Sequence, residues 1–266
     1  MSDVLAEILA HKATEVEQAR RAHPVEEWQR RPAYSAARRG FCAAVTRPRA
    51  GRPNLIAEIK RSSPSAGLIQ PDFDPVAIAR QYAAGGADAL SVLTDERYFD
   101  GRLEYLAAVK TAVALPVLRK DFLIDAYQVH EAAAAGADAV LLIADALDDA
   151  RLAELADVAR RLALDVLLEV HSRARLPAAL NVIRTWPAGV VLGINNRDLQ
   201  AQRIDLATTE QLARELPPGL PFVTESGIKT RADVERLHAA GACALLVGET
   251  LMRSGDPAAT IRELLG

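Results

Sequence analysis

The chain has 266 residues, half of them hydrophobic and a quarter charged, and its formal net charge is −3. This balance is typical of a globular protein and provides no general attraction for nucleic acid, and no apolar run reaches the about 20 residues needed to cross a bilayer. The two cysteines, Cys42 and Cys243, lie far apart. They argue against a disulfide framework or a thiolate metal site and, without a secretory signal at the start of the chain, favour a cytoplasmic protein.

The first part of the chain is predicted to be a helical arm. Residues 2–21 have the apolar spacing of a helix, and Ser2 or Asp3 is expected to cap it. A second short helix is expected after Pro24. Residues 32–53 are basic and are predicted to be irregular.

From residue 54 onward, short apolar runs alternate with helical patterns about eight times. The expected strands are 54–60, 88–93, 116–120, 138–143, 165–170, 189–195, 221–225 and 243–248. The expected helices between them include 75–84, 103–113, 126–135 and 149–162. Apolar strands alternating with helices predict an α/β fold with a parallel sheet covered by helices. We therefore expect residues 54–266 to form a single-domain (β/α)8 TIM barrel, with residues 1–53 as an N-terminal helical arm packed on it.

An internal repeat supports the barrel. "AAGGADALSVL" (83–93), "AAAAGADAVLLI" (132–143) and "HAAGACALLVG" (238–248) each contain a helix end, a Gly cap and one of the even-numbered strands. A doubly wound sheet is the alternative. It normally brings a Gly-rich nucleotide loop, and neither GxGxxG nor GxxxxGK[ST] occurs.

The odd-numbered strands end in charged residues, which are Glu58, Lys60, Lys120, Glu169 and Glu225. Any one of them alone is readily explained as a solvated strand end. In a barrel, however, alternate strand residues point inward and the carboxyl ends of the strands carry the chemistry. Five such charges on one rim predict an active site.

A lysine in such a site has two possible roles. With a lowered pKa it is an amine nucleophile that forms a Schiff base, whereas a protonated lysine donates a proton or stabilises negative charge. Three carboxylates against two lysines favour the protonated form at Lys60 and Lys120.

A phosphate site is suggested by the last two strands. Gly227 and Gly248 each follow a strand and precede a helix, where backbone N–H groups attract an anion. Ordinary turn chemistry is the other explanation. The loop 61–73, with Ser63 and Ser65, is long and resembles a lid or a substrate clamp.

Seven ordered segments, each at the end of an expected strand, carry a resemblance to a known family. They are "AEIKRSSPS" (57–65), "SVLTDERYFDG" (91–101), "PVLRKDF" (116–122), "LLEVH" (167–171), "GINNRDL" (193–199), "TESGI" (224–228) and "VGETLM" (247–252). Over essentially its whole length the chain resembles the indole-3-glycerol-phosphate synthase family of tryptophan biosynthesis. The resemblance implies a decarboxylating, dehydrating ring closure of 1-(2-carboxyphenylamino)-1-deoxyribulose 5-phosphate, with no cofactor and no metal. Association with other enzymes of the pathway is not readable from the sequence.

The resemblance also implies roles for particular residues. Lys120 would be the general acid and Glu169 the general base. Lys60 would bind the anionic substrate and is the other candidate acid. Glu58 and Asn195 would orient groups around the reacting centre. The implied substrate-binding residues are Ser63 and Arg197 for the anthranilate carboxylate, Phe99, Phe122 and Leu141 for the ring, and Glu225, Ser226, Gly227, Gly248 and Glu249 around the phosphate and the barrel mouth.

Two departures from the family pattern and three alternatives remain. Residues 175–196 are longer than in compact members and are expected on the side away from the chemistry, and Glu249 stands where some members have serine. The enzymatic alternative is a Schiff-base aldolase that uses Lys120 as nucleophile. A phosphoribosylanthranilate isomerase is disfavoured because neither cysteine ends a strand. A non-catalytic phosphate-binding barrel would be expected to lack one of the rim charges, and none is missing.

Overall fold

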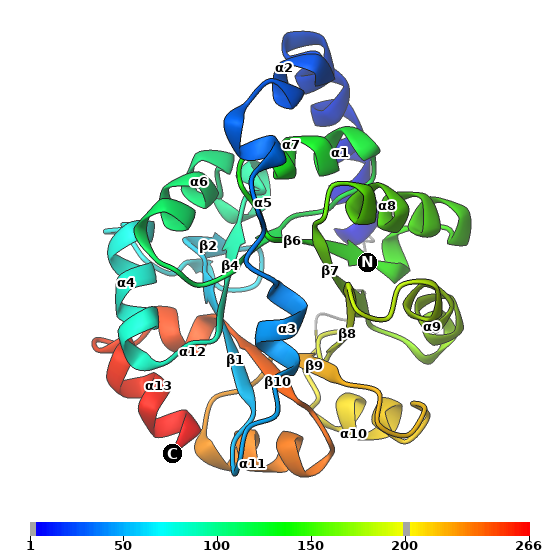
Figure 1. The fold of residues 1–266 in the computed structure, drawn as a ribbon. Helices are drawn as coiled ribbons and strands as arrows, with labels where there is room; N and C mark the ends of the chain where they lie inside the picture. Colours follow the sequence, from blue (N-terminus) through cyan, green and yellow to red (C-terminus); the bar gives the residue numbers. More distant parts are fainter. Residues whose placement is uncertain (1–3, 199–202) are drawn as a thin grey trace.

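The structure, a computed structural model, describes residues 4–198 and 203–266. Eight parallel strands form a closed barrel in the order β1-β10-β9-β8-β7-β6-β5-β4 (Figure 1). They are β1 (Asn54–Ile59), β4 (Ala89–Leu93), β5 (Val117–Lys120), β6 (Ala139–Ile143), β7 (Asp165–Val170), β8 (Val190–Asn195), β9 (Phe222–Glu225) and β10 (Ala244–Val247). β1 pairs with both β4 and β10 and so closes the barrel. The predicted TIM barrel is confirmed, and each expected strand agrees with the observed one to within one residue at either end.

The strands are apolar on both faces because each face meets a different core. In β7, Val166 and Leu168 belong to the cluster between the strands and the surrounding helices. Leu167, between them, belongs to a separate cluster that fills the interior of the barrel. Successive side chains of a strand point to opposite faces. A strand that ends in an inward-facing residue therefore delivers that side chain to the barrel mouth.

The longer helices cover the outside of the barrel. They are α4 (Pro75–Gly85), α6 (Leu103–Ala112), α7 (Ala126–Ala134), α8 (Asp149–Arg161), α9 (Leu176–Thr185), α10 (Ala207–Ala213), α11 (Arg231–Ala239) and α13 (Pro257–Leu265). Short helical segments follow four of the strands: α5 (Glu96–Phe99), η2 (Ala144–Ala146), η3 (Arg173–Arg175) and α12 (Glu249–Met252). Helices α4, α7 and α11 begin where the side chains of Asp74, Asp125 and Thr230 accept hydrogen bonds from first-turn N–H groups.

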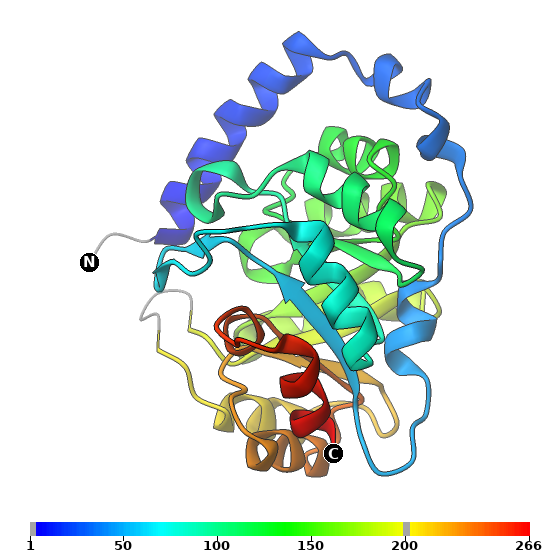
Figure 2. The same ribbon diagram turned by 90° about the vertical axis from the view of Figure 1, so that its left-hand side faces the viewer.

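The N-terminal arm extends along the barrel from one end to the other. It consists of α1 (Val4–Ala22), α2 (Val25–Gln29), η1 (Pro32–Ser35) and α3 (Phe41–Thr46). Figure 2 shows α1 along one side of the barrel and α3 at the opposite end from residue 4. The helix predicted after Pro24 is confirmed as α2. The proposed cap of the first helix, Ser2 or Asp3, lies outside the described residues.

The prediction that residues 32–53 are irregular was wrong at η1 and at α3. Phe41 and Val45 are fully buried in the cluster that fills the barrel interior. The backbone N–H of Cys42 donates to Asp165 Oδ2 at 2.7 Å, so the start of β7 holds this helix in place. Six residues are too few for a helical period to be visible in a sequence, and here burial determines the helix.

Two connections between strands contain secondary structure of their own, the loop after β1 and the segment between β7 and β8. The loop 61–73 contains a small antiparallel hairpin of β2 (Ser62–Ser63) and β3 (Gly67–Leu68). The longer segment 175–190 runs from the last residue of η3 through α9 to the turn with Trp186. This turn leads into the start of β8, which is the end away from the charged rim, as predicted. Within the described residues, no helix combines the length and apolar character needed to cross a membrane.

Candidate active site

A pocket at the carboxyl ends of the barrel strands collects most of the predicted site residues. Those that line it are Glu58, Lys60, Ser63, Phe99, Lys120, Phe122, Leu141, Glu169, Asn195, Arg197, Glu225, Ser226 and Gly248. They come from β1, β5, β6, β7, β8 and β9 and from the loops that follow the strands. The convergence that was expected of separate strand ends is therefore present in one pocket.

Lys120 forms the centre of the charge cluster. Its Nζ donates to Glu169 Oε2 at 2.6 Å and to Glu225 Oε2 at 2.9 Å. Burial by itself would lower the pKa of this ammonium, but the attraction of Glu169, then of Glu225, raises the pKa above its ordinary value. Lys120 is accordingly a cation in this pocket.

Glu169 and Glu225 have opposite pKa shifts although both are buried. Burial and the nearby charge of Glu169 raise the pKa of Glu225 to about 8. Burial opposes ionisation of Glu169 as well, but the attraction of Lys120 and then of His171 holds its pKa well below the usual range. The two carboxyls face the same ammonium and titrate together, and the opposite directions of their pKa shifts favour the ionised form of Glu169 over that of Glu225.

Lys60 and Glu58 form a second ion pair in the pocket. Lys60 Nζ donates to Glu58 Oε1 at 2.8 Å. Burial would raise the pKa of Glu58, but the charges of Lys60 and Lys120 lower it below its ordinary value. Gly248 lies so close that a Cβ there would stand 2.6 Å from Glu58 Oε1. A residue without a side chain at position 248 therefore leaves room for the carboxylate.

An apolar wall lies beside the charges. The rings of Phe99 and Phe122 are 6.2 Å apart and tilted by 40°. The N-terminal end of α1 adds Val4, Leu5 and Ile8 to the same pocket. The sequence did not show that the arm reaches the mouth of the barrel, and this contact establishes it.

Polar groups from two loops meet at the rim of the pocket. Arg197 Nη1 donates to Ser65 Oγ at 3.2 Å, which joins the end of β8 to the loop after β1. The backbone N–H of Arg197 donates to Asn195 Oδ1 at 3.0 Å. Ser63 Oγ accepts from the N–H of Ala66 at 3.2 Å. The guanidinium of Arg197 therefore contacts one serine hydroxyl of the loop after β1, and Ser63 of the same loop also lines the pocket.

Two predicted residues do not line the pocket. Gly227 has φ +85°, and a Cβ on it would stand 2.5 Å from Ile204 Cγ2. The side chain of Glu249 forms an ion pair with Arg253 at 2.9 Å, one turn along the chain. Its carboxylate is thereby held at the surface, outside the pocket.

The chain was compared with families and proteins of known identity. The family model described as indole-3-glycerol phosphate synthase matches residues 5–264. The chain belongs to the indole-3-glycerol phosphate synthase family. It is 47% identical to the indole-3-glycerol phosphate synthase of Rhodospirillum rubrum, with 100% of both chains covered, and 50% identical to that of Acidithiobacillus ferrooxidans, with 99% of both covered. The family is one of carboxy-lyases in tryptophan biosynthesis, so the chain is a decarboxylating enzyme of that pathway.

Solved structures show the same fold at low identity. The 3-hexulose-6-phosphate synthase structure matches with a TM-score of 0.60 and 21% identity, covering 79% of this chain and 97% of that one. The thiamine phosphate pyrophosphorylase of Pyrococcus furiosus matches with a TM-score of 0.56 and 18% identity, covering 80% and 94%. These likenesses concern the barrel alone.

A histidine is among the residues of this synthase-family pocket that sequence reasoning missed. His171 lines the pocket, and its Nε2 lies 2.9 Å from Glu169 Oε1. It lies just beyond the end of β7, two positions after Glu169. Residues two apart in extended chain share a face. The segment "LLEVH" therefore contained the signal.

Gly193 supports the pocket from within β8. A Cβ there would stand 2.5 Å from Glu225 Oε1 and 3.1 Å from Leu167 Cδ1. We expect Gly193→Ala to lower the free energy of unfolding by about 1–3 kcal/mol, because an extra methyl overpacks the barrel interior. The displaced carboxylate should also reduce synthase activity. Thermal unfolding and turnover are measured beside Gly255→Ala, which meets nothing within 4 Å. Equal results for both variants would contradict this packing argument.

Proposed function

We propose that this chain closes the indole ring of 1-(2-carboxyphenylamino)-1-deoxyribulose 5-phosphate with Lys120 as general acid and Glu169 as general base. The observation that carries the proposal is the contact of 2.6 Å between Lys120 Nζ and Glu169 Oε2 inside the pocket. An ammonium and a carboxylate within reach of one substrate can donate and accept protons in successive steps. Lys60, paired with Glu58, remains the other candidate donor.

The proton transfers follow the order of the bonds. As the ring carbon attacks the ketone carbon, an ammonium protonates the ketone oxygen, and carbon dioxide then leaves from the ring carbon. Loss of the resulting hydroxyl as water needs a second proton, which an acid gives to the hydroxyl. It also needs a base to remove a proton from the ring-closed intermediate. Glu169 takes that proton, and Asn195 Nδ2, which donates to Glu169 Oε1 at 3.1 Å, orients the carboxylate.

The acid and the base assist each other. The raised pKa of Lys120 comes first from the charge of Glu169, which opposes the burial effect. When Glu169 accepts a proton, that charge disappears and the pKa of Lys120 falls. The ammonium therefore becomes a better donor in the step in which Glu169 acts as base.

The walls of the pocket fit the two ends of the substrate. Arg197 and Ser63 would bind the anthranilate carboxylate, since a guanidinium suits bidentate contact with a carboxylate. Phe99, Phe122 and Leu141 would pack against the aromatic ring. A substrate folded between these contacts has its ring carbon close to its ketone carbon. Such proximity lowers the barrier to ring closure.

The phosphate is assigned to the opposite side of the pocket. Ser226 and Gly248 line the pocket, and Lys60 supplies a positive charge. Gly227 and Glu249 are assigned only through their backbone. The charge, the hydroxyl and the free N–H groups at the start of α12 support binding of a phosphorylated substrate.

The chemistry of Lys120 disfavours the Schiff-base alternative. A lysine nucleophile must lose its proton, and the raised pKa of Lys120 keeps that proton in place. We therefore expect borohydride with substrate to trap no adduct on Lys120. A trapped adduct would favour the aldolase-type mechanism.

Glu169→Gln tests the proposal. The amide keeps the size of the side chain but cannot accept the proton, so we expect kcat to fall about 10²–10⁴-fold with little change in KM. Product is followed by indole fluorescence with the carboxyphenylamino sugar phosphate as substrate. Glu154→Gln, on the exposed face of α8, is the control. Parental turnover in Glu169→Gln would exclude it as the base.

Two further features belong to this proposal. We assign the enzyme to the cytoplasm, where its phosphorylated substrate would be kept. We also assign residues 1–53 and 54–266 to one structural domain, because α1 and α3 contribute to the pocket and to the barrel interior.

A further inference from the structure

The two carboxylates that share Lys120 have unequal surroundings. Glu169 uses both oxygens: Oε2 accepts from Lys120, while Oε1 accepts from Asn195 and lies 2.9 Å from His171 Nε2. Glu225 also accepts from Lys120 through Oε2, but its Oε1 is buried without a hydrogen-bond partner among the described residues. Lys120 contacts both carboxylates and so does not distinguish them. They differ at Oε1, where Glu169 has Asn195 and His171 as neighbours.

His171 is held in place from the end of β6. Asp145, in η2, accepts from the backbone N–H of His171 at 2.9 Å and from Ser172 Oγ at 2.8 Å. The carboxylate also lies 3.5 Å from His171 Nδ1. The imidazole, with its side chain only 4% exposed, is thus enclosed between two acids, Asp145 behind it and Glu169 in the pocket.

We propose that His171, anchored by Asp145, is a positioning residue that makes Glu169 rather than Glu225 the base of the ring closure. A cation beside Oε1 of Glu169 stabilises that carboxylate in its ionised form and leaves the shared proton on Glu225. The inference rests on the proposed roles of Glu169 and Lys120 and adds to them the group that selects between two similar carboxylates.

The charges that face His171 determine the pH range in which it acts. Asp145 of η2 and Glu169 of β7 contact the imidazole, and Lys120 of β5 and Glu225 of β9 stand on the far side of Glu169. Burial would lower the pKa of His171, but Glu169 and Asp145 raise it to about 9. The imidazole is therefore charged at neutral pH and loses its charge as the pH rises through about 9.

His171→Gln removes this cation. The shared proton should then move toward Glu169, and a change of one pKa unit between the two carboxyls changes the ionised fraction of Glu169 about tenfold. We expect kcat to fall about tenfold or more at pH 7. Above the pKa of Glu225 both carboxyls lose their protons, so the deficit should shrink to about threefold or less by pH 9.5.

A second variant and a direct titration complete the test. In Asp145→Asn the pKa of His171 should fall toward its ordinary value. The imidazole should then already lose its charge at a pH below 8 as the pH rises, and the deficit in kcat should appear over that range. The chain has five histidines, and NMR of the imidazoles, assigned by the loss of one signal in His171→Gln, should show titration near pH 9 for His171.

The possible outcomes separate this inference from the proposed function. A deficit of His171→Gln that is equal at all pH values, or an imidazole that titrates near its ordinary pKa, overturns the role of His171 while Glu169 remains the base. An unimpaired variant overturns it as well. If the parent enzyme makes no indole product, or if Glu169→Gln is fully active, the proposed function itself fails. Thermal unfolding of each variant excludes loss of the fold as the cause.

Discussion

Replacement of Lys120 by methionine is expected to lower kcat/KM about 10³-fold or more. The methionine side chain fills a similar volume but can neither donate a proton nor stabilise the oxygen that gains negative charge, and each of these effects is worth about 10²–10⁴-fold. The change also removes the cation between Glu169 and Glu225, which accept from it at 2.6 and 2.9 Å. The pKa of Glu169 should then rise, and the base should be weakened together with the acid.

Lys120→Arg separates the charge of Lys120 from its proton. Arginine remains positively charged but does not release a proton at any working pH, because its pKa exceeds about 12. If proton donation is essential, Lys120→Arg should be nearly as inactive as Lys120→Met while binding substrate better. Single-turnover formation of indole product, with unfolding curves to show that each variant is folded, provides the measurement. Parental activity in Lys120→Met would exclude the mechanism proposed here.

The site could be predicted to the extent that it lies on strands. In a parallel barrel the strand ends meet at one rim and alternate residues point inward, so Glu58, Lys120, Glu169 and Glu225 could be brought together without coordinates. The direction of Arg119 follows from the same rule. It points out of the barrel and forms ion pairs with Asp121 and Glu131. Periodicity thus predicted which strand side chains face the pocket.

The features that the sequence did not reveal depend on contacts between distant segments. Helix α3 is too short to show a period, and only its burial in the barrel interior explains it. Lys12, on α1, is fully buried although it is charged. Neither of these outcomes follows from local propensity, because each partner becomes a neighbour only after folding.

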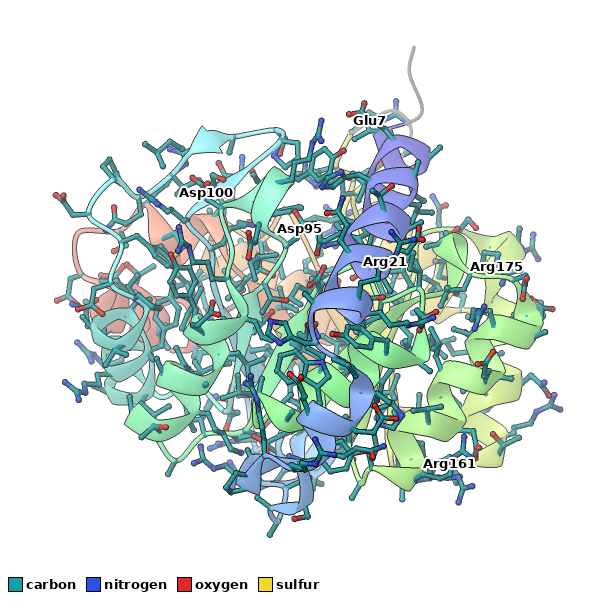
Figure 3. All side chains as sticks on the ribbon, turned by 90° about the horizontal axis from the view of Figure 1, so that it is seen from above. Glu7, Arg21, Asp95, Asp100, Arg161 and Arg175 are labelled. Atoms are coloured by element: carbon teal, nitrogen blue, oxygen red, sulfur yellow. The ribbon has the colours of Figure 1, made fainter. Side chains whose placement is uncertain are left out.

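Lys12 connects the arm to the loops that form the aromatic wall. Its Nζ forms ion pairs with Asp95 at 2.8 Å and with Asp121 at 3.0 Å. In Figure 3, Asp95 lies beside α1. The same two carboxylates accept backbone N–H bonds from Tyr98 and Phe122, each at 2.8 Å. A single buried ammonium on α1 therefore holds the loops that carry both rings of the wall.

Lys12→Met is expected to lower the free energy of unfolding by about 3–5 kcal/mol, because it leaves two buried carboxylates without their common cation. At about 2–4 °C per kcal/mol for a chain of this size, Tm should fall by roughly 6–20 °C. The matched control is Arg20→Met, also on α1, whose partner Asp125 is an exposed contact. That variant should lose at most about 1 kcal/mol.

The acid range provides an independent test of the same network. Burial would raise the pKa of Asp121, but Lys12 and then Arg119 lower it from 3.8 to about 2. A carboxyl with a lowered pKa contributes stability above its unfolded pKa, and this contribution is lost as the pH falls from about 4 through about 2. In Lys12→Met the pKa of Asp121 should rise, so that stability is lost at higher pH than in the parent. If the unfolding curves of Lys12→Met and Arg20→Met coincide from pH 7 to pH 3, α1 is not held by this buried charge, and its residues at the pocket are kept there by apolar packing alone.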